Sequence, residues 1–174
     1  ALTRTLEKQV ISASHSKDQD VFGFARKDAA VTIVVLFIRN GLINGKRTYF
    51  FADPFGEDQM ILSQALTQFY DADSSIPKEI VLPFEPADVD LHEEYVNDRA
   101  GAKVHLKIPL RGDNQKLVAM ANANAEQLFK EKEKKKQSWQ NLCQSLEKSL
   151  RLNRPPHRIE CLDISNISGK QAVG

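Results

Sequence analysis

The chain has 174 residues, 41% of them hydrophobic and 27% charged, so it can bury a core and does not have the composition of a disordered chain. Its formal net charge of +1 excludes an overall field that would draw it onto nucleic acid or membrane, so that any basic site must be local. Two cysteines without metal-binding spacing indicate a reducing compartment, and no apolar run reaches the roughly 18 residues of a membrane span.

The first half of the chain predicts a helix and then a three-stranded antiparallel meander. Apolar residues at helical spacing in 2–11 resemble the end of a helix that enters from upstream. Three segments rich in Val, Ile and Phe predict strands, at 20–25, 31–39 and 42–51. Asn40-Gly41 predicts a two-residue turn because both residues tolerate positive φ, and Gly45 predicts an irregularity in the third strand.

After the meander, helices and short strands alternate. The pattern predicts helices at 57–70, 87–100, 113–137 and 138–152, with Asp113 as a helix cap, and strands at 80–84 and 103–108. Pro155-Pro156 ends the last helix, and a final strand that contains Asp163 begins at 158. This succession, β-β-β-α-β-α-β-α, is the topology of the RNase H-like α/β fold.

Asp163 lies in an apolar run, between Leu162 and Ile164. Burying an unpaired carboxylate in the middle of a strand costs several kcal/mol, on the order of 2–7 for a polar group without a partner. The position therefore predicts a metal, a base or a dense shell of hydrogen bonds. Glu160, three residues earlier, falls on the opposite face of a strand, so it is a poor partner ligand.

Several segments resemble one family. Arg158-Ile-Glu-Cys-Leu-Asp-Ile-Ser resembles the strand that opens the endonuclease domain of UvrC, the nuclease subunit of bacterial nucleotide excision repair. Arg154-Pro-Pro-His-Arg is similar to the linker before that strand. Further similarities are found in Phe37-Ile-Arg, Tyr49-Phe-Phe, Arg111-Gly-Asp and Asn122-Ala-Asn-Ala, so that the resemblance covers nearly the whole chain.

The resemblance implies a metal-dependent nuclease. In the family an Asp-Asp-His set holds a divalent ion, Mg²⁺ or Mn²⁺, and Asp163 matches the first Asp, which makes it the expected catalytic and metal-binding residue. The other two ligands are expected after Gly174, so we expect a piece of a larger protein, with no bound cofactor and no cleavage by this piece alone. The implied partners are UvrB and damaged double-stranded DNA, in the cytoplasm, with neither a membrane nor a small-molecule substrate.

These expectations divide the chain into four parts: the end of a UvrB-binding helix and a linker at 1–17, an RNase H-like central domain at 18–137, a helical linker at 138–157, and the first strand of the endonuclease domain at 158–174. The central domain is expected to be catalytically silent. A second metal site there would have to use carboxylates at edges or in a helix's first turn, where acids are common anyway: Asp20, Glu57, Asp58 and Glu85.

Two questions stay open at the level of sequence. The candidates for DNA phosphate contacts are Arg111, Arg154 and Arg158, whereas the lysine-rich segment 130–136 is typical of a solvated helix face. The alternative to a nuclease fragment is a non-enzymatic scaffold, in which the central domain docks a protein partner of the repair complex.

Overall fold

The computed structural model describes residues 17–72, 75–156, 158–160, 165–167 and 171–173. These residues form two units, 1–130 and 131–174, each of which is described by itself. The predicted helix at 2–11 lies outside the described residues.

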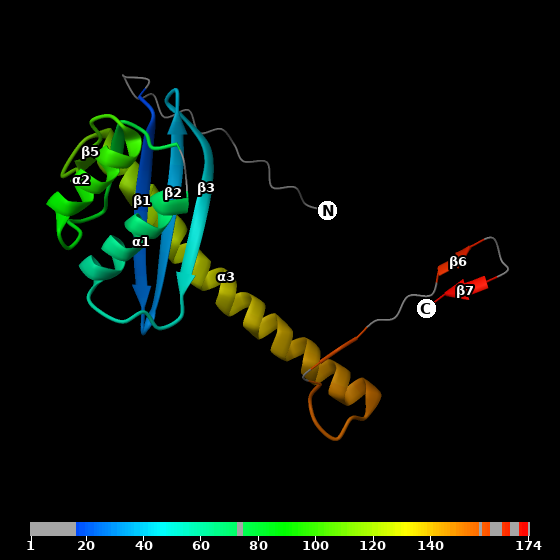
Figure 1. Cartoon of the computed structure of the whole chain (residues 1–174). Coiled ribbons are helices and arrows are strands. Elements are labelled where there is room, and N and C mark those ends of the chain that lie inside the picture. The colour runs from blue at the N-terminus through cyan, green and yellow to red at the C-terminus, as the bar shows by residue number, and fades with distance from the viewer. Residues whose placement is uncertain (1–16, 73–74, 157, 161–164, 168–170, 174) are drawn as a thin grey trace. The chain divides into compact units, whose positions relative to one another are not determined.

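The first unit is built on a five-stranded sheet of order β3-β2-β1-β4-β5 (Figure 1). The elements follow in the chain as β1 (Gln19–Lys27), β2 (Ala30–Arg39), β3 (Leu42–Phe51), α1 (Asp58–Ala72), β4 (Glu79–Val81), α2 (Val89–Ala100), β5 (His105–Lys107) and α3 (Asp113–Leu150). β1, β2 and β3 pair antiparallel, while β4 pairs parallel with both β1 and β5. The order of elements predicted from the sequence is therefore confirmed.

The meander has the predicted turn and the predicted irregularity. Asn40 and Gly41 both have positive φ, 53° and 73°, as a two-residue hairpin turn requires. Phe37 of β2 faces Gly45 of β3, but the next residue, Ile38, faces Ile43, so the register between the two strands shifts by one residue. One extra residue of β3 is thus accommodated in a bulge.

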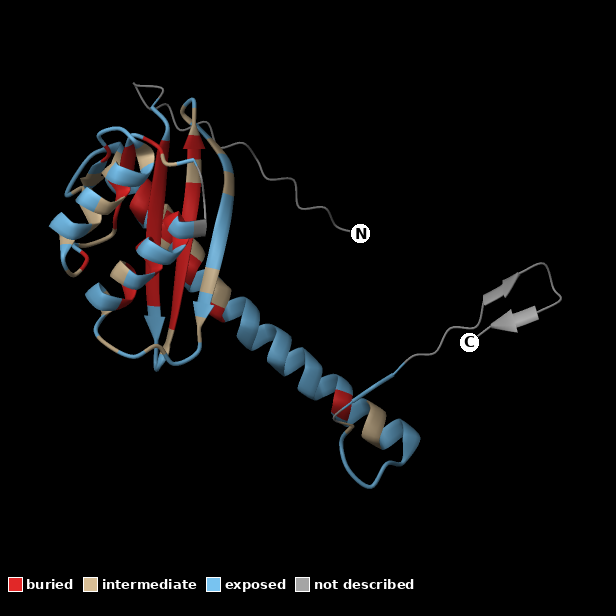
Figure 2. Cartoon of the chain, viewed as in Figure 1, coloured by how far each residue is buried: buried red, intermediate tan, exposed pale blue. Residues whose placement is uncertain are grey.

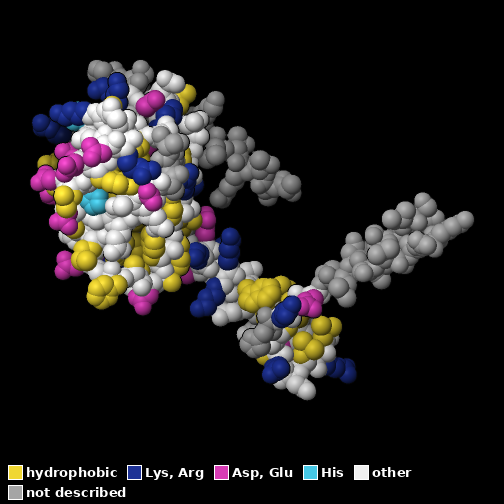
Figure 3. All heavy atoms as spheres, in the orientation of Figure 1, with side chains coloured by type: hydrophobic (Ala, Val, Ile, Leu, Met, Phe, Trp, Pro, Cys, Tyr) yellow, Lys and Arg dark blue, Asp and Glu magenta, His cyan; other side chains and the backbone are white. Residues whose placement is uncertain are grey.

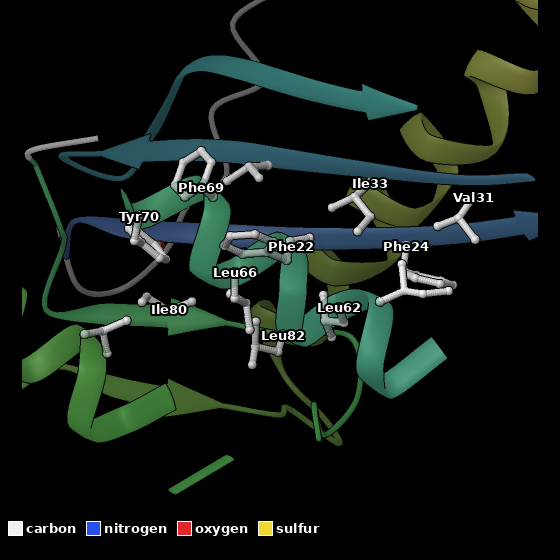
Figure 4. Packing of buried hydrophobic residues seen from close by; sticks show 14 of the residues in the cluster. Phe22, Phe24, Val31, Ile33, Leu62, Leu66, Phe69, Tyr70, Ile80 and Leu82 are labelled. Atoms are coloured by element: carbon white, nitrogen blue, oxygen red, sulfur yellow. The ribbon is translucent and has the colours of Figure 1, made fainter. Parts of the chain in front are cut away.

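One face of the sheet is covered by α1 and α2. Figure 4 shows the apolar side of α1 directed at the strands, where Phe22 packs edge-on against Phe69 with ring centroids 5.5 Å apart. Phe69 is 2% exposed and Tyr70 fully buried, and the cluster extends to Val96 of α2. The strands β1 and β2 are accordingly buried along most of their length, as Figure 2 shows.

The opposite face is covered by the first part of α3. Small residues, Ala121 and Ala125, lie fully buried on the helix where it crosses the sheet, and Leu117 and Phe129 pack beside them. Gly23 of β1 lies directly beneath the helix: a Cβ added there would overlap the backbone of Ala121 and of Asn122. Helix and strand therefore approach more closely than any side chain at position 23 would allow.

This close approach also supplies a hydrogen-bond partner for a part of β1 that pairs with no strand on the β4 side. The pairing of β1 with β4 covers only Gln19 to Val21, so beyond it the edge of β1 has no strand partner on the β4 side. The side chain of Asn122 fills this place: the N–H of Phe24 donates to its Oδ1 at 2.9 Å. An asparagine on the helix thus supplies an acceptor that the short strand does not.

The predicted break between helices at 137 and 138 is wrong. Asp113–Leu150 is one helix of 38 residues. The residues around position 137 include Lys, Glu and Gln, which favour helix, and neither Gly nor Pro interrupts them, so no local signal ends the helix there. It ends where Arg151 takes a positive φ of 49°.

The second unit contains the end of that helix and a small hairpin. Cys143 is buried and its thiol lies 3.5 Å from the carbonyl oxygen of Pro156. The strand predicted to begin at 158 is not observed at 158–160, which pair with no described strand; instead β6 (Ser165–Ile167) and β7 (Gln171–Val173) form an antiparallel pair. Asp163 lies outside the described residues.

Gly23→Ala should destabilise the domain strongly. The added methyl group can avoid the backbone of α3 only by displacing the helix, and overpacking of this kind costs about 1–3 kcal/mol. Urea unfolding followed by circular dichroism measures the loss. Gly45→Ala is the matched control, because its Cβ would lie at an ordinary 3.6 Å from Phe37, and equal stability of the two variants would contradict the proposed role of Gly23.

Candidate functional site

Polar side chains gather at the end of the sheet where the three parallel strands begin. Gln19 of β1, Glu79 of β4 and His105 of β5 stand side by side in register. Because neighbouring residues in register point to the same face, these side chains lie on the side of the sheet that α3 covers. Asp20, the next residue of β1, points to the opposite side.

Glu79 is the centre of a buried hydrogen-bond network. It is 6% exposed, and its Oε1 accepts hydrogen bonds from Nε2 of Gln19 and from Nδ2 of Asn114, the latter at 3.0 Å. Its Oε2 forms an ion pair with Nζ of Lys107. The network joins β1, β4, β5 and the first turn of α3 through one carboxylate.

The charge of Glu79 is maintained against its burial. Burial alone would raise the pKa of this carboxyl, but hydrogen bonds from Lys107 and Asn114, together with the positive charges of Lys107 and Lys17, outweigh it. The pKa of Glu79 therefore lies below its ordinary value, and the group is ionised at neutral pH.

Asp20 is held on the other side of the sheet. It is 1% exposed; its Oδ1 accepts a hydrogen bond from Arg39 at 2.8 Å, and its Oδ2 accepts one from the Tyr70 hydroxyl at 3.0 Å. The same guanidinium nitrogen of Arg39 also donates to the carbonyl oxygens of Gln19 and Ile38. This carboxylate is therefore paired within the fold, as a buried charge must be.

A pocket of about 580 Å³ opens at the end of the sheet where β1, β4 and β5 begin. Lysine and arginine side chains are visible at the end of the domain where β1 begins (Figure 3). The pocket is lined by residues from the start of β1, the end of β2, the segment before β4 and the start of β5: Lys17, Asp18, Arg39, Ser75, Ile76, Pro77, Lys78, Glu79 and His105.

The other predicted carboxylates do not join this cluster. Asp58 accepts a hydrogen bond from Arg26 at 2.6 Å, in the first turn of α1. Glu57 and Glu85 are exposed loop residues. Among the described residues no three His, Cys, Asp or Glu side chains come together as a metal site would require.

The three predicted phosphate-contacting arginines are all exposed, but they lie in different places. Arg111 stands in the loop between β5 and α3, beside Gly112 with its positive φ of 85°. Arg154 and Arg158 belong to the second unit, and Arg158 forms an ion pair with Glu160 at the surface. Arg111, which belongs to the same unit as the pocket, is not among the residues that line it.

None of the residues that line the pocket was predicted from the sequence as a site residue. Glu79 was placed outside the predicted strand, and Lys17 and Lys78 are single lysines without a motif. The one available signal is the order Lys78-Glu79 directly before an apolar strand. The Asn122-Ala-Asn-Ala motif has a structural explanation instead, since Asn122 bonds β1 and Asn124 accepts from Lys46 of β3.

The sheet order and the helices on both faces define an RNase H-like domain. Residues 18–132 match the family model of the UvrC Ribonuclease H-like domain, and residues 147–174 match that of the UvrC RNAse H endonuclease domain. The chain therefore belongs to the UvrC family, and the resemblance seen in the sequence is confirmed.

Curated relatives agree with this assignment. The chain is 52% identical over its whole length to the UvrABC system protein C of Desulfotalea psychrophila, and 37% identical over its whole length to that of Syntrophotalea carbinolica. It spans 29% and 28% of these two relatives.

Within the described part of the chain, no helix is both long enough and apolar enough to cross a membrane.

Glu79 should make the stability of the domain depend on pH. Because the pKa of its carboxyl is lower in the folded than in the unfolded state, its contribution is complete above the unfolded value, near 4.5, and is lost as the pH falls through the folded pKa. Glu79→Gln should therefore be less stable than the wild type at neutral pH, with a difference that shrinks below pH 4.5.

Urea unfolding at a series of pH values measures this difference. Glu85→Gln, at an exposed position, is the control and should follow the wild type throughout. A difference between Glu79→Gln and wild type that stays constant through the acid range would contradict the assignment.

Proposed function

We propose that the chain is part of an excision nuclease that incises damaged DNA beside a lesion in nucleotide excision repair. The observation that carries this proposal is the match of residues 147–174 to the UvrC RNAse H endonuclease domain, because Asp163 lies within that segment. The name shared by the relatives, UvrABC system protein C, supports a place in the same repair system, with UvrB and damaged double-stranded DNA as partners in the cytoplasm.

In this proposal the chain contributes Asp163 to the chemistry. A carboxylate is the ligand type that Mg²⁺ and Mn²⁺ favour, so the residue fits the ion that the family implies. When bound, such an ion activates water and stabilises charge on the phosphate during phosphodiester hydrolysis. Asp163 would anchor that ion, and its place in an apolar sequence would fix the position of the carboxylate.

The central domain serves as a scaffold in the same proposal. This assignment is supported by the two buried carboxylates, since Asp20 is held by Arg39 and Tyr70, and Glu79 by Gln19, Lys107 and Asn114. Carboxylates that are already bonded on both oxygens would have to break those bonds to bind a metal. The bonding of both carboxylates within the fold also favours the second candidate function, in which the domain docks a protein partner and performs no chemistry of its own.

Asp163→Asn in the full-length protein should abolish incision of lesion-containing duplex in the presence of UvrA, UvrB and Mg²⁺. The amide keeps the size of the side chain but removes the charge that attracts a divalent ion, so a loss of about a hundredfold or more in rate is expected. Denaturing gel electrophoresis of labelled duplex measures it. Glu160→Gln is the control, because Glu160 is exposed and pairs with Arg158 at the surface. Undiminished incision by Asp163→Asn would refute the assignment.

The 174-residue chain alone should leave lesion-containing duplex intact with Mg²⁺ or Mn²⁺, because only one carboxylate of the expected ligand set has been identified in it. The same gel assay tests this. Cleavage that survives repurification and disappears in Asp20→Asn or in Glu85→Gln would instead place an active site in the central domain.

A further inference from the structure

The pocket at the end of the sheet where the parallel strands begin is lined by more positively than negatively charged side chains. Two of the charges beside it are already neutralised: Glu79 by Lys107, and Arg39 by Asp20. Asp18 accepts a hydrogen bond from the backbone N–H of Asn40 at 3.0 Å. Among the described residues, neither Lys17 nor Lys78 forms a salt bridge, although both are exposed and both line the pocket.

Lys17 and Lys78 give the pocket two ammonium groups that have no salt-bridge partner among the described residues, and these groups attract an anion. Each ammonium group offers three donors on a flexible stem, which suits a tetrahedral anion better than a planar one. His105 also lines the pocket and carries a ring N–H that can donate. The three donors come from three separate segments of the chain, all of which line the pocket.

The interior of the pocket is rigid where it is formed by the sheet. Pro77 and Glu79 are buried, and the N–H of His105 bonds the carbonyl oxygen of Lys78 at 2.9 Å, which ties the segment before β4 to β5. Lys78 and His105 are therefore held at a fixed backbone spacing. Such a spacing reduces the ordering cost of binding a ligand.

We propose that this pocket is a phosphate-binding site, that Lys17, Lys78 and His105 are its donors, and that the phosphate it holds is one of a DNA backbone. The choice of DNA over a free anion rests on the proposed function, in which the domain works on a duplex. Such a contact would position DNA without reading its sequence, as an enzyme directed by lesions requires. The contact would lie in the domain that contributes no metal-binding residue to the proposed chemistry.

The test compares two pairs of charge removals in the 174-residue chain. Lys17→Gln with Lys78→Gln removes the proposed contacts; Lys134→Gln with Lys135→Gln removes the same charge from exposed positions of α3 that do not line the pocket. Fluorescence anisotropy of a labelled DNA duplex, repeated over a series of salt concentrations, gives the dissociation constant and its salt dependence. Thermal unfolding verifies that both variants are folded.

The pocket variant should bind about tenfold more weakly at low salt, and the slope of log K against log salt should become shallower by about 1, because one phosphate contact is lost. The α3 variant should keep the wild-type slope. Equal losses in the two variants, or an unchanged slope in the pocket variant, would overturn the proposal.

A second arm separates DNA from a free anion. Inorganic phosphate is titrated into the isotopically labelled chain at constant ionic strength, and the amide resonances of 17–20, 75, 76, 78, 79 and 105 are followed. Saturable shifts that vanish in the pocket variant, without binding of the duplex, would retain the phosphate site but assign it to a free phosphate. If the chain neither binds the duplex nor shows such shifts, the proposal is overturned.

Failure of the pocket assignment and failure of the proposed nuclease function can be distinguished. If Asp163→Asn abolishes incision by the full-length protein while the pocket variant binds DNA like the wild type, the pocket assignment alone fails. If Asp163→Asn incises normally but the pocket variant shows a shallower slope of log K against log salt, the nuclease assignment fails and the phosphate site stands.

Discussion

The approach of α3 to β1 at Gly23 is the constraint on which the first unit depends. The absence of a side chain there lets the helix backbone come close enough for Asn122 to bond the uncovered edge of β1. The same helix carries Asn114 to Glu79 in its first turn, so its position also determines the geometry of the polar network. Gly23 therefore connects the packing of the core with the polar network at the end of the sheet where the pocket opens.

The two buried carboxylates show how charge can be used for architecture within a fold that elsewhere supports nuclease chemistry. Asp20 and Glu79 lie on opposite faces of the sheet at the same edge, and each is bonded to residues from more than one element. Leaving either unpaired would be costly in the interior, which makes each carboxylate and its partners interdependent. This interdependence supports a scaffolding role for the domain and leaves the proposed chemistry to the segment that contains Asp163.

Much of the fold followed from the sequence because its signals are local. Asn40-Gly41 specifies its turn through the backbone conformations it tolerates, and the β-branched run of β2 specifies a buried strand. The continuous helix Asp113–Leu150 was missed because the change in composition near residue 137 resembles a boundary although no residue there stops a helix. Residues 158–160, where a strand was expected to begin, are not in a strand, because a strand depends on its neighbour as much as on its own residues.

The sequence by itself determined the order of elements, the family and Asp163 as the residue expected to bind metal, because each of these depends on periodicity or on a contiguous motif. Only the tertiary structure decided which polar residues meet. Lys17, Lys78 and His105 are far apart in the chain, and the parallel register of β1, β4 and β5 brings them to one end of the sheet. Arg39 reaches the same end through the antiparallel pairing of β2 with β1. Such proximity arises from pairing between distant segments, which no local pattern of residues records.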